Sequence, residues 1–256
     1  ELYIVNEKIG SGVFSTVVRA QSRTDDGQQY AIKAIDISKM TPGNRSPLRP
    51  DSTPNITREI SIMRSLEGRH PGIMSLSEVI ADDTRNMLFL VMPHASGGDL
   101  HERLQRTGPL GEDDASELFR GVATAVKFCH DRGVVHRDIK PENIVLMVRE
   151  REEGNTTTGK AAAAAALRPV LCDFGCAART GPAGGFPDAL TTMCGTPEYA
   201  APEMVLGVPY GKPVDVWGCG VVLFRLLCGA RGAITGADFP RGRMSAEARD
   251  ILTALL

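Results

Sequence analysis

The fold of this chain is constrained most by a polar string, His136–Asn143, and by the tripeptide Asp173-Phe174-Gly175 that follows it. Asp138 can accept a proton from an attacking hydroxyl, and Lys140 can neutralise charge on a phosphoryl group during transfer. Asn143 and the aspartate of the tripeptide carry hard oxygen ligands, which Mg²⁺ prefers. These groups can act on one phosphate–magnesium complex only if the fold holds both segments side by side. The alternative is a loop of solvated polar side chains, and we favour phosphate handling because the string is long and the tripeptide follows it.

Length and composition predict one large domain or two lobes. With 256 residues, of which 42% are hydrophobic, the chain can bury a sizeable core. The formal net charge is -2 and the basic residues are scattered, so we expect no nucleic-acid partner. No apolar run approaches the ~20 residues of a membrane span, and no signal pattern occurs at the amino end, so we expect no membrane span.

The six cysteines lack the spacing of a disulfide framework, which favours reduced thiols in an intracellular compartment, most simply the cytoplasm. Cys172 and Cys176 have the spacing of half a zinc site. Because Asp-Phe-Gly lies between them and no second pair follows at ligand spacing, we expect no metal there.

The amino-terminal part has the composition of an antiparallel β-meander with one helix. Ile56, Ile60 and Met63 recur at helical spacing after a Pro/Gly/Ser/Arg-rich loop over residues 38–54. Pro93 and the glycines after it interrupt regular structure. We therefore expect an amino-terminal lobe over residues 1–92, a hinge over 93–96 and a second lobe over 97–256. The expected strands are Leu2–Val5, Thr16–Val18, Tyr30–Ile35 and Met87–Met92.

The second lobe has a helical pattern. The segment Val214–Cys228 is apolar on nearly all sides, as in a helix at the centre of a lobe, and Ser245 begins a last helix. A low-complexity segment over about residues 148–168, between two short strands, predicts a surface insertion without a catalytic role. Two apolar helix faces are expected: Leu118, Val122, Val126 and Cys129, and Ile251, Leu252 and Leu255.

Three further groups of residues could bind the phosphates of a nucleotide. Gly10 and Gly12 form a glycine-rich turn between two strands, which fits a flap over phosphates, although taken alone it is better interpreted as an ordinary hairpin turn. Lys33 ends an apolar strand and could point into the cleft. Glu59 lies at the edge of the apolar helix face and could pair with it. Taken singly, both charges would be solvated.

Together, these motifs resemble the eukaryotic protein kinase family from Gly10 to about the chain end. The resemblance implies a bilobal α+β fold, with a small antiparallel β lobe holding one main helix and a larger, mainly helical lobe. It also implies ATP and Mg²⁺ as cofactors. Gly10 and Gly12 then cover the phosphates, and Lys33 contacts them and pairs with Glu59. The implied catalytic base is Asp138, the implied Mg²⁺ ligands are Asn143 and Asp173, and Asp215 braces the catalytic loop.

Further roles follow only from the resemblance. Met92 is the implied gatekeeper and Ala95 the backbone contact of adenine. Pro93 lacks an N–H, but its position supplies a carbonyl, so adenine binding is retained. The remaining implied nucleotide-binding positions are Val17, Ala31 and Asp99.

Lys140 and the segment Gly195–Glu198 resemble the serine/threonine branch, most of all the calcium/calmodulin-dependent kinase group. The expected partner is therefore a protein substrate with a serine or threonine acceptor. An upstream kinase and calcium/calmodulin-type regulation outside this segment are further expected partners in signalling. Arg137 can pair with phosphate, which predicts control by phosphorylation of Thr192, with Thr191 as the alternate acceptor.

Substrate selection involves three charged residues in this resemblance. Asp99 and Glu142 match positions that select basic residues before the acceptor, whereas Arg225 stands where relatives usually carry glutamate. We therefore expect the site to prefer one basic substrate residue before the acceptor and to tolerate a second basic residue less well.

The chain also departs from the family pattern. Between Gly229 and Ser245, a short connection replaces a helix that would dock substrates or regulators. Glu203 lacks its usual arginine partner, which would lie beyond Leu256, and full burial would then destabilise the fold by about 3–5 kcal/mol. These departures favour the alternative, a pseudokinase or nucleotide-binding scaffold without turnover. Retention of the catalytic residues favours the kinase. A nucleotide-binding enzyme of another class is disfavoured by the absence of its phosphate-loop and dinucleotide motifs.

Overall fold

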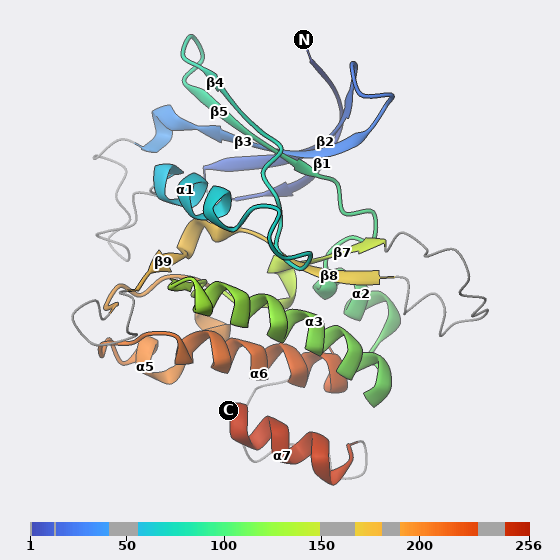
Figure 1. Cartoon of the computed structure of the whole chain (residues 1–256), viewed down its shortest axis with the longest axis vertical. Helices are drawn as coiled ribbons and strands as arrows, with labels where there is room; N and C mark the ends of the chain where they lie inside the picture. Colours follow the sequence, from blue (N-terminus) through green and yellow to red (C-terminus); the bar gives the residue numbers. More distant parts are fainter. Residues whose placement is uncertain (1, 13, 41–55, 149–166, 181–189, 230–243) are drawn as a thin grey trace.

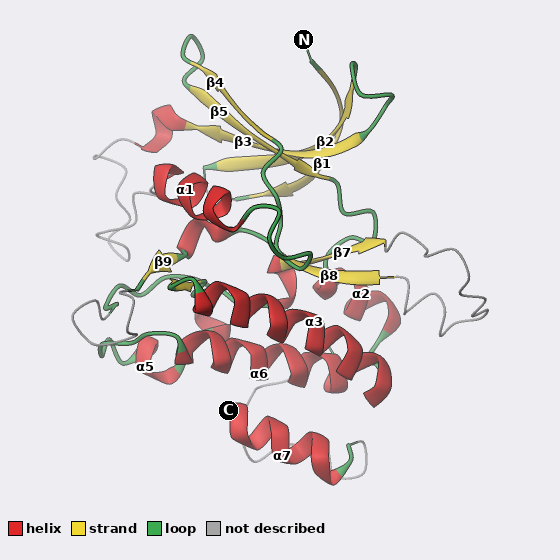
Figure 2. Ribbon diagram, viewed as in Figure 1, coloured by secondary structure: helices red, strands yellow, loops and turns green. Residues whose placement is uncertain are grey.

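The computed structural model describes residues 2–12, 14–40, 56–148, 167–180, 190–229 and 244–256. A large sheet with one main helix forms one lobe, most helices gather in the other lobe together with short strands, and the chain crosses between the lobes after β5 (Figure 1, Figure 2). The bilobal α+β fold implied by the sequence is therefore confirmed. None of the helices in the described ranges is long and apolar enough to cross a membrane.

The first lobe is built on a five-stranded antiparallel sheet with strand order β1-β2-β3-β5-β4. The four expected strands are present, and β1 and β2 extend well beyond their predicted bounds. The sequence prediction missed β4, a short strand at the sheet edge. The five strands are β1 (Tyr3–Ser11), β2 (Ser15–Ser22), β3 (Gln29–Asp36), β4 (Glu78–Asp82) and β5 (Met87–Pro93).

Helix α1 (Ile56–Leu66) lies beneath this sheet and packs against η4 (Phe174–Cys176) of the other lobe (Figure 1). Its buried face consists of Glu59, Ile62, Met63 and Leu66, whereas Ile60 is only half-buried. The expected helical spacing was right, because Met63 is buried and Ile56 and Ile60 are partly buried and pack against the core. Glu59, beside this apolar face, is buried as well, so its carboxylate lies inside rather than on the surface.

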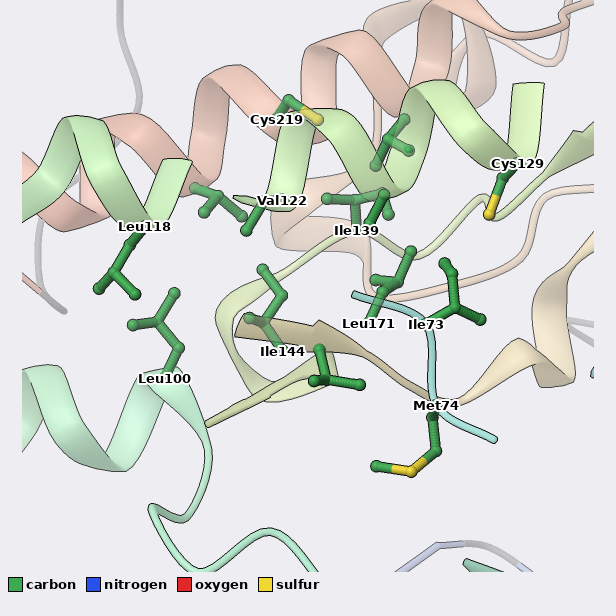
Figure 3. Close-up of a cluster of buried hydrophobic side chains, with 14 of the residues drawn as sticks. Ile73, Met74, Leu100, Leu118, Val122, Cys129, Ile139, Ile144, Leu171 and Cys219 are labelled. Carbon is green, nitrogen blue, oxygen red and sulfur yellow. The ribbon is translucent and has the colours of Figure 1, made fainter. Parts of the chain in front are cut away.

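The second lobe is organised around α3 (Glu112–Asp131) and α6 (Pro213–Cys228), which pack together. The predicted apolar stripe of α3 is buried as expected. Ile139, which follows Asp138, and Ile144, which follows Asn143, point into the same core (Figure 3). Burial of these side chains fixes the loop between them. The remaining elements are η1 (Ile37–Met40), α2 (Leu100–Thr107), β6 (Val134–Val135), η3 (Pro141–Asn143), β7 (Ile144–Val148), β8 (Leu167–Leu171), η4 (Phe174–Cys176), β9 (Ala178–Arg179), η6 (Pro197–Tyr199), α5 (Pro202–Val205) and α7 (Ala246–Leu255).

The last helix, α7, begins as predicted, with the Ser245 hydroxyl accepting from the backbone N–H of Ala248 (3.1 Å). Its expected apolar face was partly wrong. Ile251 is 49% exposed, whereas Leu252 is fully buried and packs in the core. The N–H of Ser245 also donates to Glu112 at the start of α3 (2.5 Å), which joins the two helix starts.

Several predicted boundaries shift. Val148 pairs with Leu167 across β7 and β8, so the expected insertion narrows to residues 149–166, which lie outside the described residues. Pro93 is the last residue of β5, and the hinge over residues 93–96 remains a prediction. The predicted loop over 38–54 opens with the end of η1, and its residues from 41 onward are not described; the same applies to the short connection over 230–243. Glu203 is half-buried, so the full burial assumed for an unpaired carboxylate is not met.

Candidate active site

The catalytic loop is held by Asp215, a fully buried residue in the first turn of α6. One carboxylate oxygen accepts from the backbone N–H of Arg137 (2.7 Å). The other accepts from the N–H of His136 (2.8 Å) and lies 2.8 Å from Nε2 of His130 on α3. Arg137 has φ 69°, a left-handed conformation that a non-glycine residue adopts at a cost of about 1–2 kcal/mol. The Asp215 bonds hold this conformation, as the sequence resemblance implied.

Asp138 lies at the centre of a network of donors. Its carboxylate accepts from Nδ2 of Asn143 (2.9 Å), from Nζ of Lys140 (2.8 Å) and from the backbone N–H of Thr196 (3.0 Å). Lys140 also donates to the Thr196 hydroxyl (2.5 Å). The Asp138 and Lys140 side chains are only 10% and 16% exposed. A carboxylate held by these donors is fixed in direction and ready to accept a hydrogen bond from a hydroxyl.

Lys33 joins the two lobes across the cleft. Its ammonium lies 2.7 Å from Glu59 and 2.9 Å from Asp173, so the predicted pairing with Glu59 is confirmed. Burial lowers the pKa of Lys33, but the carboxylates of Asp173 and Glu59 outweigh burial and raise it above the usual value. Burial likewise raises the pKa of Asp173, and Lys33 outweighs this effect and lowers it. Both groups are therefore charged at neutral pH.

The Asp-Phe-Gly segment is fixed by its central phenylalanine. Phe174 is fully buried, and its ring meets that of His136 edge to face at 4.9 Å between centroids. Asp173 has φ 57° and accepts from the N–H of Gly175 (3.4 Å). Its side chain stays 49% exposed. The carboxylate thus faces the cleft while the backbone on either side is anchored.

The glycine-rich turn lies where β1 turns into β2, between two strands as expected. Gly10 pairs with Val17, and the N–H of Gly12 donates to the carbonyl of Ser15 (2.8 Å). A Cβ on Gly12 would lie 2.8 Å from Oγ of Ser15, so a side chain there would require the Ser15 hydroxyl to rotate away. Its role over phosphates remains a prediction.

The expected adenine positions are neighbours in the sheet. Val17 pairs with Lys33 across β2 and β3, and Ala31 pairs with Met92 across β3 and β5. The N–H of Gly97 donates to the carbonyl of Leu146 (2.9 Å), which ties the segment after the hinge to β7. A nucleotide lying on this surface would contact these positions together, and its binding there remains a prediction.

Ala95 and Asp99 lie on the segment that follows β5. The Ala95 carbonyl accepts from the N–H of Gly98 (3.2 Å). Asp99 caps α2 by accepting from the N–H of Glu102 (2.8 Å), and burial raises its pKa. The structure gives Asp99 a capping role that the sequence prediction did not include; contact of either residue with nucleotide remains a prediction.

The oxygen ligands available in this site suit a magnesium–nucleotide complex. Nδ2 of Asn143 is engaged by Asp138, which directs its carbonyl oxygen away from that bond, and Asp173 adds a carboxylate. Within the described ranges, no group of three or more His, Cys, Asp or Glu could hold a metal by itself. Mg²⁺ typically uses one or two protein carboxylates together with substrate phosphates, so this sparse set is the appropriate kind.

Arg137 is engaged by protein groups. Its Nε donates to the carbonyl of Cys176 (2.6 Å) and its Nη1 to the hydroxyl of Tyr210 (3.1 Å). The Tyr210 hydroxyl in turn donates to the carbonyl of Thr192 (2.5 Å). The structure therefore connects the expected regulatory residues through Tyr210, which the sequence prediction missed.

Two other contributors were missed. Thr196 was used only to assign the serine/threonine branch, yet it contacts both Asp138 and Lys140. His130 belongs to no recognisable motif, and its imidazole contacts Asp215, which lies 85 positions further along the chain. Only a three-dimensional arrangement could show either contact.

Glu142, which we expect to select basic substrate residues, contacts two neighbouring side chains. It accepts from the Tyr199 hydroxyl (3.2 Å) and lies 3.3 Å from Nδ1 of His101. Arg225 is buried in α6, with its guanidinium 5.9 Å from the centre of the Tyr199 ring. The two opposite charges therefore flank one aromatic ring.

Comparison with known proteins agrees with this geometry. The family model described as "Protein kinase domain" matches residues 3–236. Calcium/calmodulin-dependent protein kinase type 1 of Caenorhabditis briggsae is 39% identical over 229 residues, which cover 90% of this chain and 55% of the relative. CBL-interacting serine/threonine-protein kinase 15 of Arabidopsis thaliana is 40% identical over 228 residues, covering 89% and 47%. Myosin light chain kinase A of Dictyostelium discoideum is 34% identical over 229 residues, covering 90% and 67%.

The chain spans about half the length of most of the curated relatives it matches. The family match extends over both lobes and includes the Lys33 ion pairs and the Asp138 network. The chain therefore belongs to the protein kinase family.

Proposed function

We propose that this chain is the catalytic domain of an ATP- and Mg²⁺-dependent protein serine/threonine kinase. One observation carries the proposal: Asp138 is held by Lys140, Asn143 and Thr196 close to an intact Lys33–Glu59–Asp173 arrangement. A scaffold that only binds nucleotide has no need of an oriented base. The names of the relatives, which include serine/threonine kinases, support the same assignment.

In this proposal each group has a distinct task. Asp138 accepts a hydrogen bond from the substrate hydroxyl and takes its proton, while Lys140, beside it, offsets negative charge on the phosphoryl group. Lys33, oriented by Glu59, holds the nucleotide phosphates. Asn143 and Asp173 would hold Mg²⁺, which neutralises phosphate charge when bound. Positioning and electrostatic stabilisation account for most of the rate enhancement.

The deciding experiment is transfer of radiolabelled phosphate from ATP to a mixed peptide library, with Asp138→Asn as the inactive control. We expect the variant to lose activity by at least about 10²-fold because it removes the base. ATP binding should persist, since Asp138 does not hold the phosphates. If the wild type shows no more transfer than Asp138→Asn while still binding ATP, the scaffold assignment is correct instead.

Regulation and substrate choice extend the proposal. We expect phosphorylation of Thr192 to raise activity, because Thr192 is connected to Arg137 through Tyr210. Thr192→Ala should then lower the activity of the phosphorylated protein, while Thr191→Ala leaves it unchanged. Equal activity of the Thr192 variant and the wild type after full phosphorylation contradicts this.

For the substrate we propose a basic residue before the acceptor, read by Asp99 and Glu142. The opposite charge of Arg225 near Glu142 limits the preference to one such residue. A peptide array without basic preference at any position contradicts this assignment.

We further propose that an upstream kinase and a calcium/calmodulin-type region outside these residues regulate the chain, since several relatives are named as calcium/calmodulin-dependent. The six cysteines are free thiols, which supports a reducing, cytoplasmic setting.

A further inference from the structure

Tyr210, in the connection between α5 and α6, joins two segments that lie far apart in the sequence. Its backbone pairs with that of Leu190 through one N–H···O bond in each direction (2.9 and 3.0 Å). Its hydroxyl donates to the carbonyl of Thr192 (2.5 Å) and accepts from Nη1 of Arg137 in the catalytic loop (3.1 Å). One residue therefore ties the segment over residues 190–196 to the catalytic loop.

The Tyr210 ring is fixed by packing. The residue is only 6% exposed and lies in a hydrophobic cluster with Met204 of α5 and Val214 of α6. Burial raises the pKa of Tyr210 to about 12, although Arg137 opposes this, so the hydroxyl keeps its proton at neutral pH. The hydroxyl can therefore donate to Thr192 and accept from Arg137 at the same time.

Arg137 depends on such acceptors because its side chain is buried. The residue is 8% exposed, and its Nε donates to the carbonyl of Cys176 (2.6 Å). A buried charged donor that loses its acceptor destabilises the arrangement around it. The Cys176 carbonyl and the Tyr210 hydroxyl are both neutral, so these bonds hold the guanidinium without a phosphate.

The segment after Thr192 packs tightly on the catalytic loop. A Cβ on Gly195 would lie 2.8 Å from the carbonyl of Arg137 and 2.9 Å from Oδ1 of Asp138. The next residue, Thr196, donates its backbone N–H to Asp138 (3.0 Å). A displaced Thr192 would therefore also displace the donor that holds Asp138.

We propose that Tyr210 is a positioning residue for phosphoryl transfer. Its hydroxyl holds the Thr192 carbonyl beside Arg137. This contact keeps the N–H of Thr196 on the Asp138 carboxylate. The role rests on the proposed kinase activity, and it acts on kcat rather than on ATP binding, which we assign to other residues.

The test compares Tyr210→Phe with the wild-type chain after phosphatase treatment. Phenylalanine keeps the buried ring and removes only the hydroxyl. We expect kcat to fall at least about tenfold with KM for ATP unchanged, because a misplacement of about 1 Å can lower a rate by about 10²-fold. The same fall should occur in a Thr192→Ala background, which keeps the carbonyl but cannot carry a phosphate. Tyr3→Phe is the matched control, since it removes a partly buried hydroxyl that donates to Glu78 (2.9 Å) in the other lobe, and it should leave kcat unchanged.

Amide hydrogen exchange tests the same contact without any activity. The backbone N–H groups of Tyr210 and Thr196 are hydrogen-bonded. Their exchange should accelerate at least about tenfold in Tyr210→Phe, because losing the hydroxyl bonds makes local opening easier, and Tyr3→Phe should exchange like the wild type.

The outcomes separate this role from the proposed function. If the wild type transfers no phosphate, the proposed function fails and the role fails with it, whereas exchange still shows whether the hydroxyl holds the segment. If the wild type is active, an unchanged kcat or unchanged exchange in Tyr210→Phe overturns the role alone. A rise in KM for ATP without a fall in kcat, or a fall that disappears in the Thr192→Ala background, also overturns it.

Discussion

Replacement of Asp215 tests the physical basis of the catalytic loop. Asp215→Ala removes the acceptor of two backbone N–H groups, those of His136 and Arg137, and the partner of His130. His136 is fully buried and Arg137 nearly so, so water cannot replace the acceptor without rearrangement. An unsatisfied buried donor costs about 1–3 kcal/mol. We therefore expect the free energy of unfolding to fall by about 3–5 kcal/mol.

The expected loss is large enough to measure in two ways. For a domain of this size, about 1 kcal/mol shifts Tm by about 2–4 °C, so Tm should fall by about 10 °C. Urea unfolding can be followed by the fluorescence of Trp217, the single tryptophan, which lies on α6 two residues after Asp215. Asp215→Asn keeps one acceptor oxygen and should lose roughly half as much.

The control for this prediction is Asp250→Ala, which removes an exposed carboxylate on α7. It should change the free energy of unfolding by less than about 0.5 kcal/mol. A loss below about 1 kcal/mol for Asp215→Ala would refute the reasoning, because the two N–H groups would then have found other acceptors.

Three other predictions address the cleft. Gly195→Ala should lower the free energy of unfolding by about 1–2 kcal/mol and kcat by at least about tenfold, since φ is 83° and the new Cβ would lie 2.9 Å from Oδ1 of Asp138. Gly211→Ala, where no strained φ or close contact occurs, should be neutral in the same melts and assays. Glu59→Gln should lower kcat/KM at least about tenfold, with the exposed Glu67→Gln unchanged, because it removes a charge 2.7 Å from Lys33; equal values for both variants would argue against the ion pair. Iodoacetamide labelling of Cys194 should rise through about pH 7 and then level off as the thiolate fraction saturates, and a rate that keeps rising to about pH 9 would contradict the pKa of about 7 to which Cys176 and then Arg137 lower this thiol.

Patterns governed by local chemistry were predicted well. The four strands, the α3 stripe and the α6 helix follow from periodicity, because apolar faces of helices and strands must be buried. The Lys33–Glu59 pair followed from combining weak signals, and the structure confirms it. The prediction of which helix face is buried failed at Ile251, since its neighbour Leu252 occupies the core.

Contacts between distant segments could not be predicted. Thr196 and His130 carry no sequence signal for their partners, because the side chains meet only after the activation segment and α3 pack against the catalytic loop.

The sequence by itself determined the chemistry. The two motifs supply a carboxylate base, an ammonium, an amide and a second carboxylate, and this combination suits phosphoryl transfer. These groups were recognisable because each motif is a short, continuous stretch of the chain. Only the tertiary structure determined how the side chains of those groups are oriented in the site. The bonds of Asp215 hold Arg137 in its left-handed conformation, and Thr196 directs Asp138, because hydrogen bonds between segments that lie 58 and 78 positions apart exist only in the folded chain.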